Sequence, residues 1–175
     1  IISNSIISGN TSTGGSYWYY GGGGVYCNNA SPHIKDVTIS GNTANAPGGG
    51  IYTVGSSNAT IENVIISSNV SNHNITGGGI NNSDSSPTLK NVLIINNTVS
   101  VSSRGGGIFT SGPSSVLTII NVTIAGNSYH GIYTTGGQLD VKNSIIVNNS
   151  SEIYNYNNNS TINVSYSIVS NGYTG

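Results

Sequence analysis

The sequence carries little charge: its 175 residues include four Lys or Arg and five Asp or Glu, which gives a net charge of −1. The basic residues are also widely spaced along the chain; they are Lys35, Lys90, Arg104 and Lys142. Nucleic acids and anionic membranes are captured by clustered basic side chains. We therefore expect no nucleic-acid partner.

Cysteine and long apolar runs are also scarce. Cys27 is the single cysteine, which excludes an internal disulfide framework and a multi-cysteine zinc site. No run of 18 apolar residues exists, so we expect no membrane span. The sequence opens on Ile1 without Met or a signal peptide, and we expect residues 1–175 to form a single domain that is a fragment of a longer chain.

The chain is rich instead in Asn, Ser, Thr and Gly, interspersed with Ile and Val. Disordered chains lack such β-branched residues, so we expect a folded domain. Its surface would be neutral and hydrogen-bonding, as in secreted scaffolds. Such a surface favours association, because little charge repulsion opposes it.

A six-residue motif, Val/Ser-x-Ile-Ser-x-Asn, recurs with variations along the whole chain. Its copies begin at Ser5, Val37, Val64, Val92, Val122, Ser144 and Ser167. The spacing varies from 22 to 32 residues, and the longer intervals contain extra Ser, Gly and Asn. Because loops absorb length cheaply, a fixed strand motif at a variable period is typical of a solenoid.

Each repeat also contains two further strand patterns. The strand upstream of the motif alternates with a period of two, which points one apolar column inward: Ile34, Ile61, Leu89, Ile119, Val141 and Val164. An Asp or Asn stands between the two strands and favours a sharp corner, because these residues tolerate left-handed backbone angles: Asp36, Asn63, Asn91, Asn121 and Asn143. The third strand follows a glycine run, as at Gly48 to Gly50 before Ile51.

The three strands per repeat predict an all-β fold, a right-handed parallel β-helix (solenoid) of about seven coils of three short strands. Successive coils would pair in parallel at about 4.8 Å. Stacking then converts each position of the repeat into a column of side chains. The Asn that closes the motif should form a buried ladder of amides, a structural role that we favour over metal or substrate binding: Asn10, Asn42, Asn69, Asn97, Asn127 and Asn149.

One outward column is apolar or β-branched and contains Ile6, Thr38, Ile65, Leu93, Thr123, Ile145 and Ile168. Its neighbour is mostly small and contains Ser8, Ser40, Ser67, Ile95, Ala125, Val147 and Ser170. The two columns predict a flat face without charge. Such a face fits a solvated sheet covered by a loop or a neighbouring domain, or an association surface. Ice-binding proteins also use flat faces, but they favour Thr at the same position of every coil, whereas most coils here carry Ile or Leu at this position.

A second outward column is aromatic and contains Tyr26, Tyr52, Phe109, Tyr133 and Tyr154; Trp18 belongs to a further aromatic cluster in the first long loop. Because each ring follows an inward Ile or Val, we expect the rings to point outward. They could stack on one another between coils, or hold a glycan between rings and neighbouring Asn and Ser side chains. We favour ring packing and keep glycan contact as the alternative.

The carboxylates are too sparse to predict an active site. Glycoside hydrolysis needs two carboxylates about 5–9 Å apart, and the nearest candidates are Asp36 and Glu62 in adjacent coils. We expect Lys35 and Lys90, at positions equivalent to Glu62, to pair with these acids instead. The histidines His33, His73 and His130 lack metal-ligand spacing. We predict no catalytic residue, no metal and no cofactor.

Two smaller features complete the residue-level predictions. Cys27 should be a small, semi-buried residue without a base to activate it. Sequons for N-glycosylation are frequent and include Asn58, Asn69, Asn74, Asn121 and Asn163. They would be used only in a host that has the machinery.

The repeats resemble those of secreted and surface β-helix proteins, in particular polymorphic outer-membrane protein repeats and choice-of-anchor proteins. The resemblance is carried by the segment Asn121 to Asn127, by Gly48 to Tyr52 and by Asn143 to Asn149. It covers nearly the whole chain and implies a β-helix at the cell surface or outside the cell. It transfers no catalytic residue, since these proteins serve adhesion, scaffolding and glycan contact alike.

We therefore expect a non-catalytic extracellular structural or adhesive module, partnered by copies of itself or by neighbouring domains of its chain, in a surface assembly or filament. A carbohydrate-binding module that uses the aromatic column is the alternative. A polysaccharide lyase or hydrolase is the third hypothesis.

Overall fold

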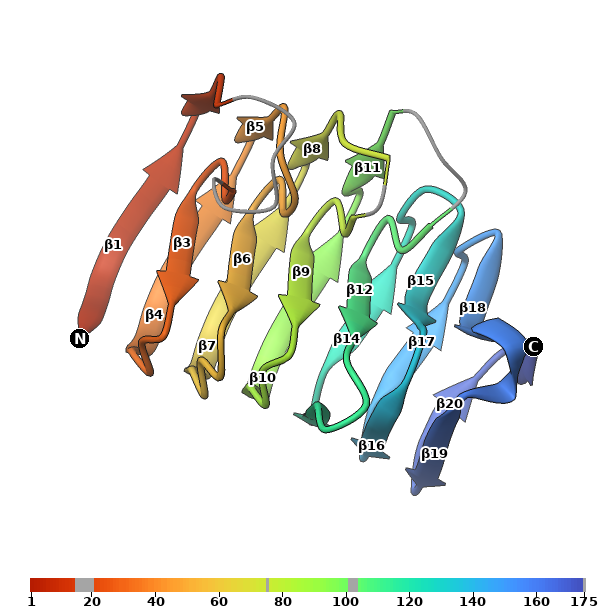
Figure 1. Ribbon diagram of the computed structural model, residues 1–175. Coiled ribbons are helices and arrows are strands. Elements are labelled where there is room, and N and C mark those ends of the chain that lie inside the picture. Colours follow the sequence, from red (N-terminus) through yellow and green to blue (C-terminus); the bar gives the residue numbers. More distant parts are fainter. Residues whose placement is uncertain (15–20, 75, 101–103, 175) are drawn as a thin grey trace.

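The computed structural model describes residues 1–14, 21–74, 76–100 and 104–174. Within them the chain forms three parallel β-sheets and one short 3₁₀ turn at Tyr156–Asn158, which is followed by the last strands. Figure 1 shows the successive coils side by side in the order of the sequence, from the N-terminus to the C-terminus. The molecule is a parallel β-helix, as predicted.

We call each coil of the solenoid a rank, numbered from the N-terminus. The first sheet contains the upstream strand and the repeat motif of every rank. Its strands are β1 (Ile2–Ser8), β4 (His33–Ser40), β7 (Thr60–Ser67), β10 (Thr88–Ile95), β13 (Val116–Ile120), β14 (Thr123–Ala125), β16 (Gly137–Lys142), β17 (Ile145–Val147), β19 (Ser160–Ser165) and β20 (Ile168–Val169). Neighbouring strands pair in register, so residues of one column face each other from coil to coil.

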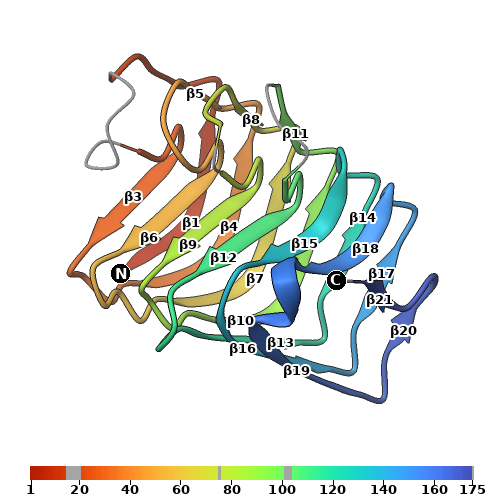
Figure 2. The same cartoon turned by 45° about the vertical axis from the view of Figure 1, so that its right-hand side comes forward.

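The second sheet is short and the third sheet follows the glycine runs. The second contains β2 (Thr11–Ser12), β5 (Thr43–Ala44), β8 (Val70–Ser71) and β11 (Thr98–Val99). The third contains β3 (Val25–Asn28), β6 (Ile51–Val54), β9 (Ile80–Ser83), β12 (Ile108–Ser111), β15 (His130–Thr134), β18 (Ser151–Asn155) and β21 (Tyr173–Thr174). Figure 2 shows the third sheet in front of the first.

The corner within each repeat differs from its prediction. The corner residues are left-handed as expected, with φ of +55° at Asp36 and +53° at Asn63. However, the strands on both sides of each corner belong to one bent sheet, and β4, β7 and β10 run through the corner without interruption. The third side of the coil is instead made by the two-residue strands after the ladder Asn, which the sequence patterns missed.

The predicted number of complete coils was too high. The first and third sheets have seven ranks, but the described second sheet has four. The ladder Asn and the next inward strand of the third sheet are separated by a long segment in the early ranks, whereas Asn127 is followed closely by β15 and Asn149 by β18. The later coils are therefore too small for a strand on the second side, and the rod tapers.

The core consists of the inward apolar columns. Ile34, Ile61, Leu89 and Ile119 are fully buried, as predicted from the alternation, and the third sheet adds a parallel column that includes Ile51. Val164 is an exception, because 39% of its surface is exposed. It lies on β19, the last strand of its sheet, so no further described rank covers its outer side.

Glycine is required where successive coils approach most closely. A Cβ atom on Gly50 would lie 2.6 Å from the carbonyl oxygen of Gly79, and one on Gly79 would lie 2.7 Å from that of Gly107. Real Cβ contacts do not reach such distances. The glycine column thus allows the backbones of successive coils to stack closely just before the strands of the third sheet.

Candidate functional site

The predicted asparagine ladder is confirmed as a continuous chain of hydrogen bonds. The side-chain amide of each ladder Asn donates to the Oδ1 atom of the next, over 2.9 Å from Asn42 to Asn69 and 3.0 Å from Asn69 to Asn97. The same chain continues at both ends, from Asn10 to Asn42, from Asn97 to Asn127 and from Asn127 to Asn149.

Each buried ladder amide is also bonded to the backbone. Asn69 Nδ2 donates to the Ile39 carbonyl, and Asn69 Oδ1 accepts from the backbone N–H of Asn42. The ladder residues from Asn42 to Asn149 are buried, whereas Asn10 in the first rank is exposed. Because buried polar groups are costly unless they are bonded, this geometry explains why the position requires an amide that both donates and accepts.

Two further polar columns also form ladders of hydrogen bonds, which the sequence analysis did not predict. At the exposed corner, Asn63 donates to Asp36, Asn91 to Asn63, and Asn121 to Asn91, over 3.0–3.1 Å. In the interior of the third sheet, Thr53 Oγ1 donates to Asn82 Oδ1 over 2.8 Å and Asn82 Nδ2 donates to Thr110 Oγ1 over 2.9 Å. The regular spacing of these residues was the available signal, but it does not reveal which column is buried.

Cys27 begins this interior column, in register with Thr53. It is buried, more deeply than the predicted semi-buried position. Burial raises the pKa of the Cys27 thiol, which disfavours the reactive thiolate.

The flat apolar face lies on the first sheet, as predicted. Its columns pair in register from rank to rank, with Thr38 between Ile6 and Ile65, and Thr123 between Leu93 and Ile145. All seven residues of the Ile/Thr column, from Ile6 to Ile168, are exposed or half-buried. The exposed fractions reach 75% at Ile6 and 59% at Ile168.

The aromatic column is largely buried, so the predicted outward exposure was wrong for most of it. Tyr52, Phe109 and Tyr133 are exposed by 0%, 1% and 5%, respectively. A Cβ atom on Gly21 would lie only 2.0 Å from the Tyr52 ring, because the Gly21 backbone lies against it. Tyr26 remains 37% exposed and Tyr154 is half-buried. Trp18 lies outside the described residues.

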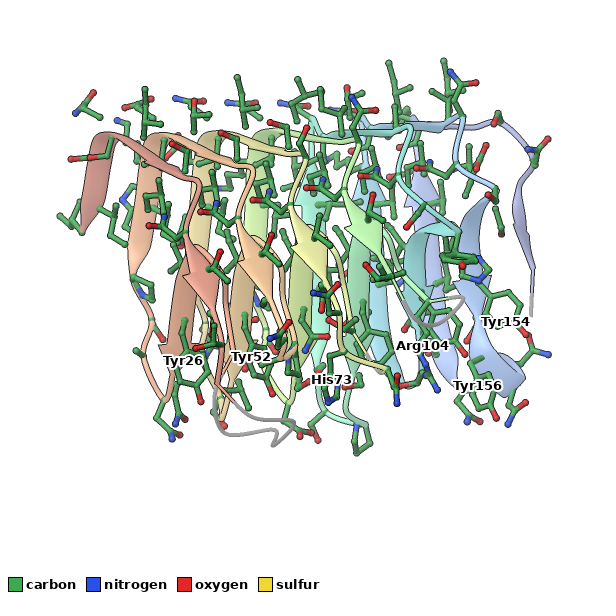
Figure 3. All side chains as sticks on the ribbon, turned by 90° about the horizontal axis from the view of Figure 1, so that it is seen from above. Tyr26, Tyr52, His73, Arg104, Tyr154 and Tyr156 are labelled. Carbon is green, nitrogen blue, oxygen red and sulfur yellow. The ribbon has the colours of Figure 1, made fainter. Side chains whose placement is uncertain are left out.

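The rings pack on one another in two clusters, which agrees with the packing interpretation. The ring centroids of Tyr26 and Tyr52 are 5.4 Å apart, and those of Tyr133 and Tyr154 are 5.1 Å apart. The Arg104 guanidinium lies over the Tyr133 ring at 5.2 Å, within cation–π range. Figure 3 shows Tyr26 and Tyr52 at one end of the rod edge and Tyr154 and Tyr156 near the other.

A groove of about 530 Å³ lies beside the first cluster. It is lined by Tyr26, Asn28, Asn29, Tyr52, Val54, Gly55, Ser83, Asp84 and Ser111. These residues come from β3, β6, β9 and β12 and from the turns that follow them, so the groove crosses four consecutive ranks. Burial raises the pKa of Tyr52 to about 12, although a hydrogen bond to Ser83 opposes the rise.

The predicted pairing of the charged groups is observed in part, because Lys35 lies beside Asp36 but Glu62 pairs with His33 rather than with a lysine. Lys35, Glu62 and Lys90 are adjacent in register, but the Glu62 carboxylate lies 3.1 Å from His33 Nε2. Lys35 Nζ lies 4.0 Å from its chain neighbour Asp36. His33 pairs with Thr60 of the next rank in the sheet, which brings its ring within reach of Glu62.

No three His, Cys, Asp or Glu side chains of residues 1–14, 21–74, 76–100 and 104–174 gather into a group that could hold a metal ion. In the same part of the chain, no helix has the length and hydropathy that crossing a membrane requires.

One carboxylate is buried, that of Glu152 on β18. Because β18 pairs with β15 so that Ile153 faces Ile132, Glu152 occupies the same position as Gly131. In earlier ranks this position is the last glycine of each glycine run. The Oε1 atom of Glu152 accepts from Ser170 and Asn171, and its Oε2 atom has no hydrogen-bond partner among the described residues. Glu152 thus ties the seventh rank to the sixth.

The sequons differ in accessibility. Asn69 belongs to the buried ladder, so a glycan cannot be attached there in the folded protein. Asn58, Asn74, Asn121 and Asn163 are exposed.

The family comparison agrees with this geometry. A family model described as "Right handed beta helix region" matches residues 23–175. No match was found among curated proteins or among solved structures.

Proposed function

The chain belongs to the right-handed β-helix family, and we propose that it is a non-catalytic structural or adhesive module of a secreted or surface protein. One observation carries this proposal: the polar side chains that recur in every repeat bond to the equivalent side chains of the next rank. Side chains committed to stacking hold the rod together and leave few groups for chemistry. The neutral, Asn- and Ser-rich surface supports a location outside the cell.

We further propose that the module associates with copies of itself through the Ile/Thr face. The face offers exposed apolar side chains in successive ranks of one sheet, and contiguous exposed apolar surface is typical of interfaces. Neither of its two columns contains a charged residue, so two copies would meet without like-charge repulsion. A second copy therefore fits the face, and a neighbouring domain of the same protein is the competing occupant.

Sedimentation velocity over a range of concentrations tests the association. We expect the wild-type chain to form a concentration-dependent oligomer and the Ile65→Lys variant, changed at a 43% exposed position near the centre of the face, to remain monomeric. Thr118→Lys is the matched control, because Thr118 points outward on the other side of the corner in the same sheet.

A wild-type chain that stays monomeric at all concentrations would refute association between copies. Equal loss of the oligomer in both Lys variants would show that added charge, rather than the face, is responsible.

The third hypothesis, polysaccharide cleavage, has a separate test. We expect no release of reducing ends or unsaturated products when the chain is incubated with neutral or uronate polysaccharides. Turnover that disappears in Glu62→Gln, at the carboxylate beside His33, would contradict the non-catalytic proposal.

A further inference from the structure

We propose that the groove beside Tyr26 binds a neutral linear oligosaccharide, with the Tyr26 ring against the apolar face of one sugar and Asn28, Asn29 and Asp84 bonded to its hydroxyl groups. This ligand site lies on the third sheet and is independent of the association face on the first sheet. Of the predicted aromatic column it uses only Tyr26 as a stacking surface, because most of the other rings are buried.

The Tyr26 ring is held in a fixed position by its neighbour. Tyr52 is fully buried, and its ring centroid lies 5.4 Å from that of Tyr26 at an interplanar angle of 34°. Tyr26 itself keeps 37% of its surface exposed at the wall of the groove. A rigid ring that is apolar on one face and polar at its hydroxyl end loses little entropy when a sugar stacks on it.

The polar groups of the groove are also prearranged. Asn29 Nδ2 donates to Asn28 Oδ1 over 2.9 Å, which fixes both amides while each retains further donor or acceptor capacity. Gly55, with a φ of +66°, leaves the space beside them open, because a Cβ atom there would lie 2.9 Å from Asn28 Oδ1. Amides and a carboxylate around an aromatic wall match the alternating donors and acceptors of sugar hydroxyl groups.

Charge and shape select the type of saccharide. Asp84 is the one charged side chain in the groove lining, so it repels the carboxylates of uronates while accepting hydrogen bonds from neutral hydroxyl groups. The lining comes from four consecutive ranks, so the groove is elongated along the rod. A volume of about 530 Å³ lies within the usual range for small-molecule sites.

Titration of the ¹⁵N-labelled chain, followed by amide chemical shifts, tests the site. The neutral probes are cellotetraose, mannotetraose and the tetramer of N-acetylglucosamine, and tetragalacturonate is the anionic probe. We expect saturable shifts with at least one neutral probe, centred on Asn28, Asn29 and Gly55, at an affinity roughly between micromolar and millimolar.

The ring and the carboxylate have separate variants. We expect Tyr26→Ala to weaken binding about tenfold or more and Tyr26→Phe to retain it within about threefold, because stacking needs the ring rather than the hydroxyl group. Tyr156→Ala is the matched control, since Tyr156 is a 42% exposed ring in the other aromatic cluster. Asp84→Asn should allow tetragalacturonate to bind, and Asn tolerates the left-handed φ of +48° at this position.

Three results would overturn the proposal: no saturable shift with any neutral probe, equal affinity of the wild type for tetragalacturonate, or full binding by Tyr26→Ala. Dispersed amide spectra of each variant show that it is folded. Because association is measured separately through Ile65→Lys, failure of the sugar site leaves the scaffold proposal intact.

Discussion

At the scale of single residues, the ladder amides have the most demanding environment in the molecule. Asn69 is completely buried and takes part in hydrogen bonds with the ranks before and after it. Its replacement would leave buried donors of Asn42 and the Ile39 carbonyl without their partner. An unsatisfied buried polar group costs about 1–3 kcal/mol.

We expect Asn69→Ala to lower the free energy of unfolding by about 2–4 kcal/mol, since more than one buried group loses its partner. Urea denaturation gives this value. The matched control is Asn72→Ala, an exposed Asn in the same coil that bonds to Asn45; it should change stability by less than about 0.5 kcal/mol. Similar losses in the two variants would mean that the ladder contributes no more than a surface amide pair.

Tyr52 provides a prediction on pH. Burial raises its pKa from 10.0 to about 12, so the unfolded chain loses this proton at a lower pH than the folded chain. The stabilising contribution is complete below pH 10 and is lost as the pH rises toward 12. Urea midpoints measured between pH 9 and 11.5 should therefore fall more steeply in the wild type than in Tyr52→Phe.

The control for this pH series is Tyr166→Phe, because Tyr166 is 85% exposed. Its slope should match that of the wild type. Identical slopes for the wild type and Tyr52→Phe would show that the Tyr52 phenol ionises without opposing the fold.

The residue-level predictions succeeded where a column is defined by its own strand. The ladder and the inward Ile column follow from alternation and repetition, and both are observed. The burial of Tyr52 and Phe109 could not be predicted in this way, because Gly21 lies against the Tyr52 ring and Arg104 over the Phe109 ring, and both belong to segments outside the strands. Their length varies from repeat to repeat, so no periodic pattern records them.

At the scale of secondary-structure elements, the close stacking of the third sheet depends on the glycine column. Gly79 does not adopt a left-handed φ, yet a Cβ atom there would meet the Gly107 carbonyl and Asn97 Nδ2. Gly41 has the opposite character, with a φ of +61° and nothing within 4 Å of an added Cβ atom. The two positions thus separate steric contact from backbone strain.

We expect Gly79→Ala to destabilise the protein by about 3 kcal/mol, because stacked backbones must move apart. Gly41→Ala should cost only about 1 kcal/mol, the cost of a left-handed Ala. Thermal or urea unfolding of both variants measures the difference. Equal destabilisation would mean that the ranks separate easily and that the close contact at Gly79 adds no cost beyond that of a left-handed alanine.

The sequence located the strands of the first and third sheets but assigned the corners incorrectly. A left-handed Asp36 or Asn63 was expected to separate two faces, yet the same two strands pair with each other on both sides of it. The two-residue strands such as Thr43–Ala44 were missed because two residues are too few to display an alternating pattern. Their place is fixed by bonds between ranks, including Thr43 N–H to the Asn10 carbonyl.

At the scale of the whole molecule, stability is built from contacts between neighbouring ranks. Each rank pairs with the one before and the one after it, so a repeat protein of this kind opens most easily from its ends. The first strand, β1, contains no fully buried residue, and neither does the last long strand, β19. By contrast, β4 and β7 each have three buried residues in their patterns.

This architecture predicts a gradient of hydrogen exchange along the rod. Amides of β7 and β10, which are covered on both sides, should exchange at least about 100-fold more slowly than those of β1 and β20, because opening an end breaks a single interface between ranks. Mass spectrometry of peptic fragments, or amide NMR, measures the rates. Glu152→Gln gives a further expectation: by replacing the carboxyl group that accepts from Ser170 and Asn171, it should accelerate exchange in β20 while leaving β1 unchanged. Uniform protection along all seven ranks would contradict independent opening of the ends, and it would mean that the rod unfolds as one cooperative unit.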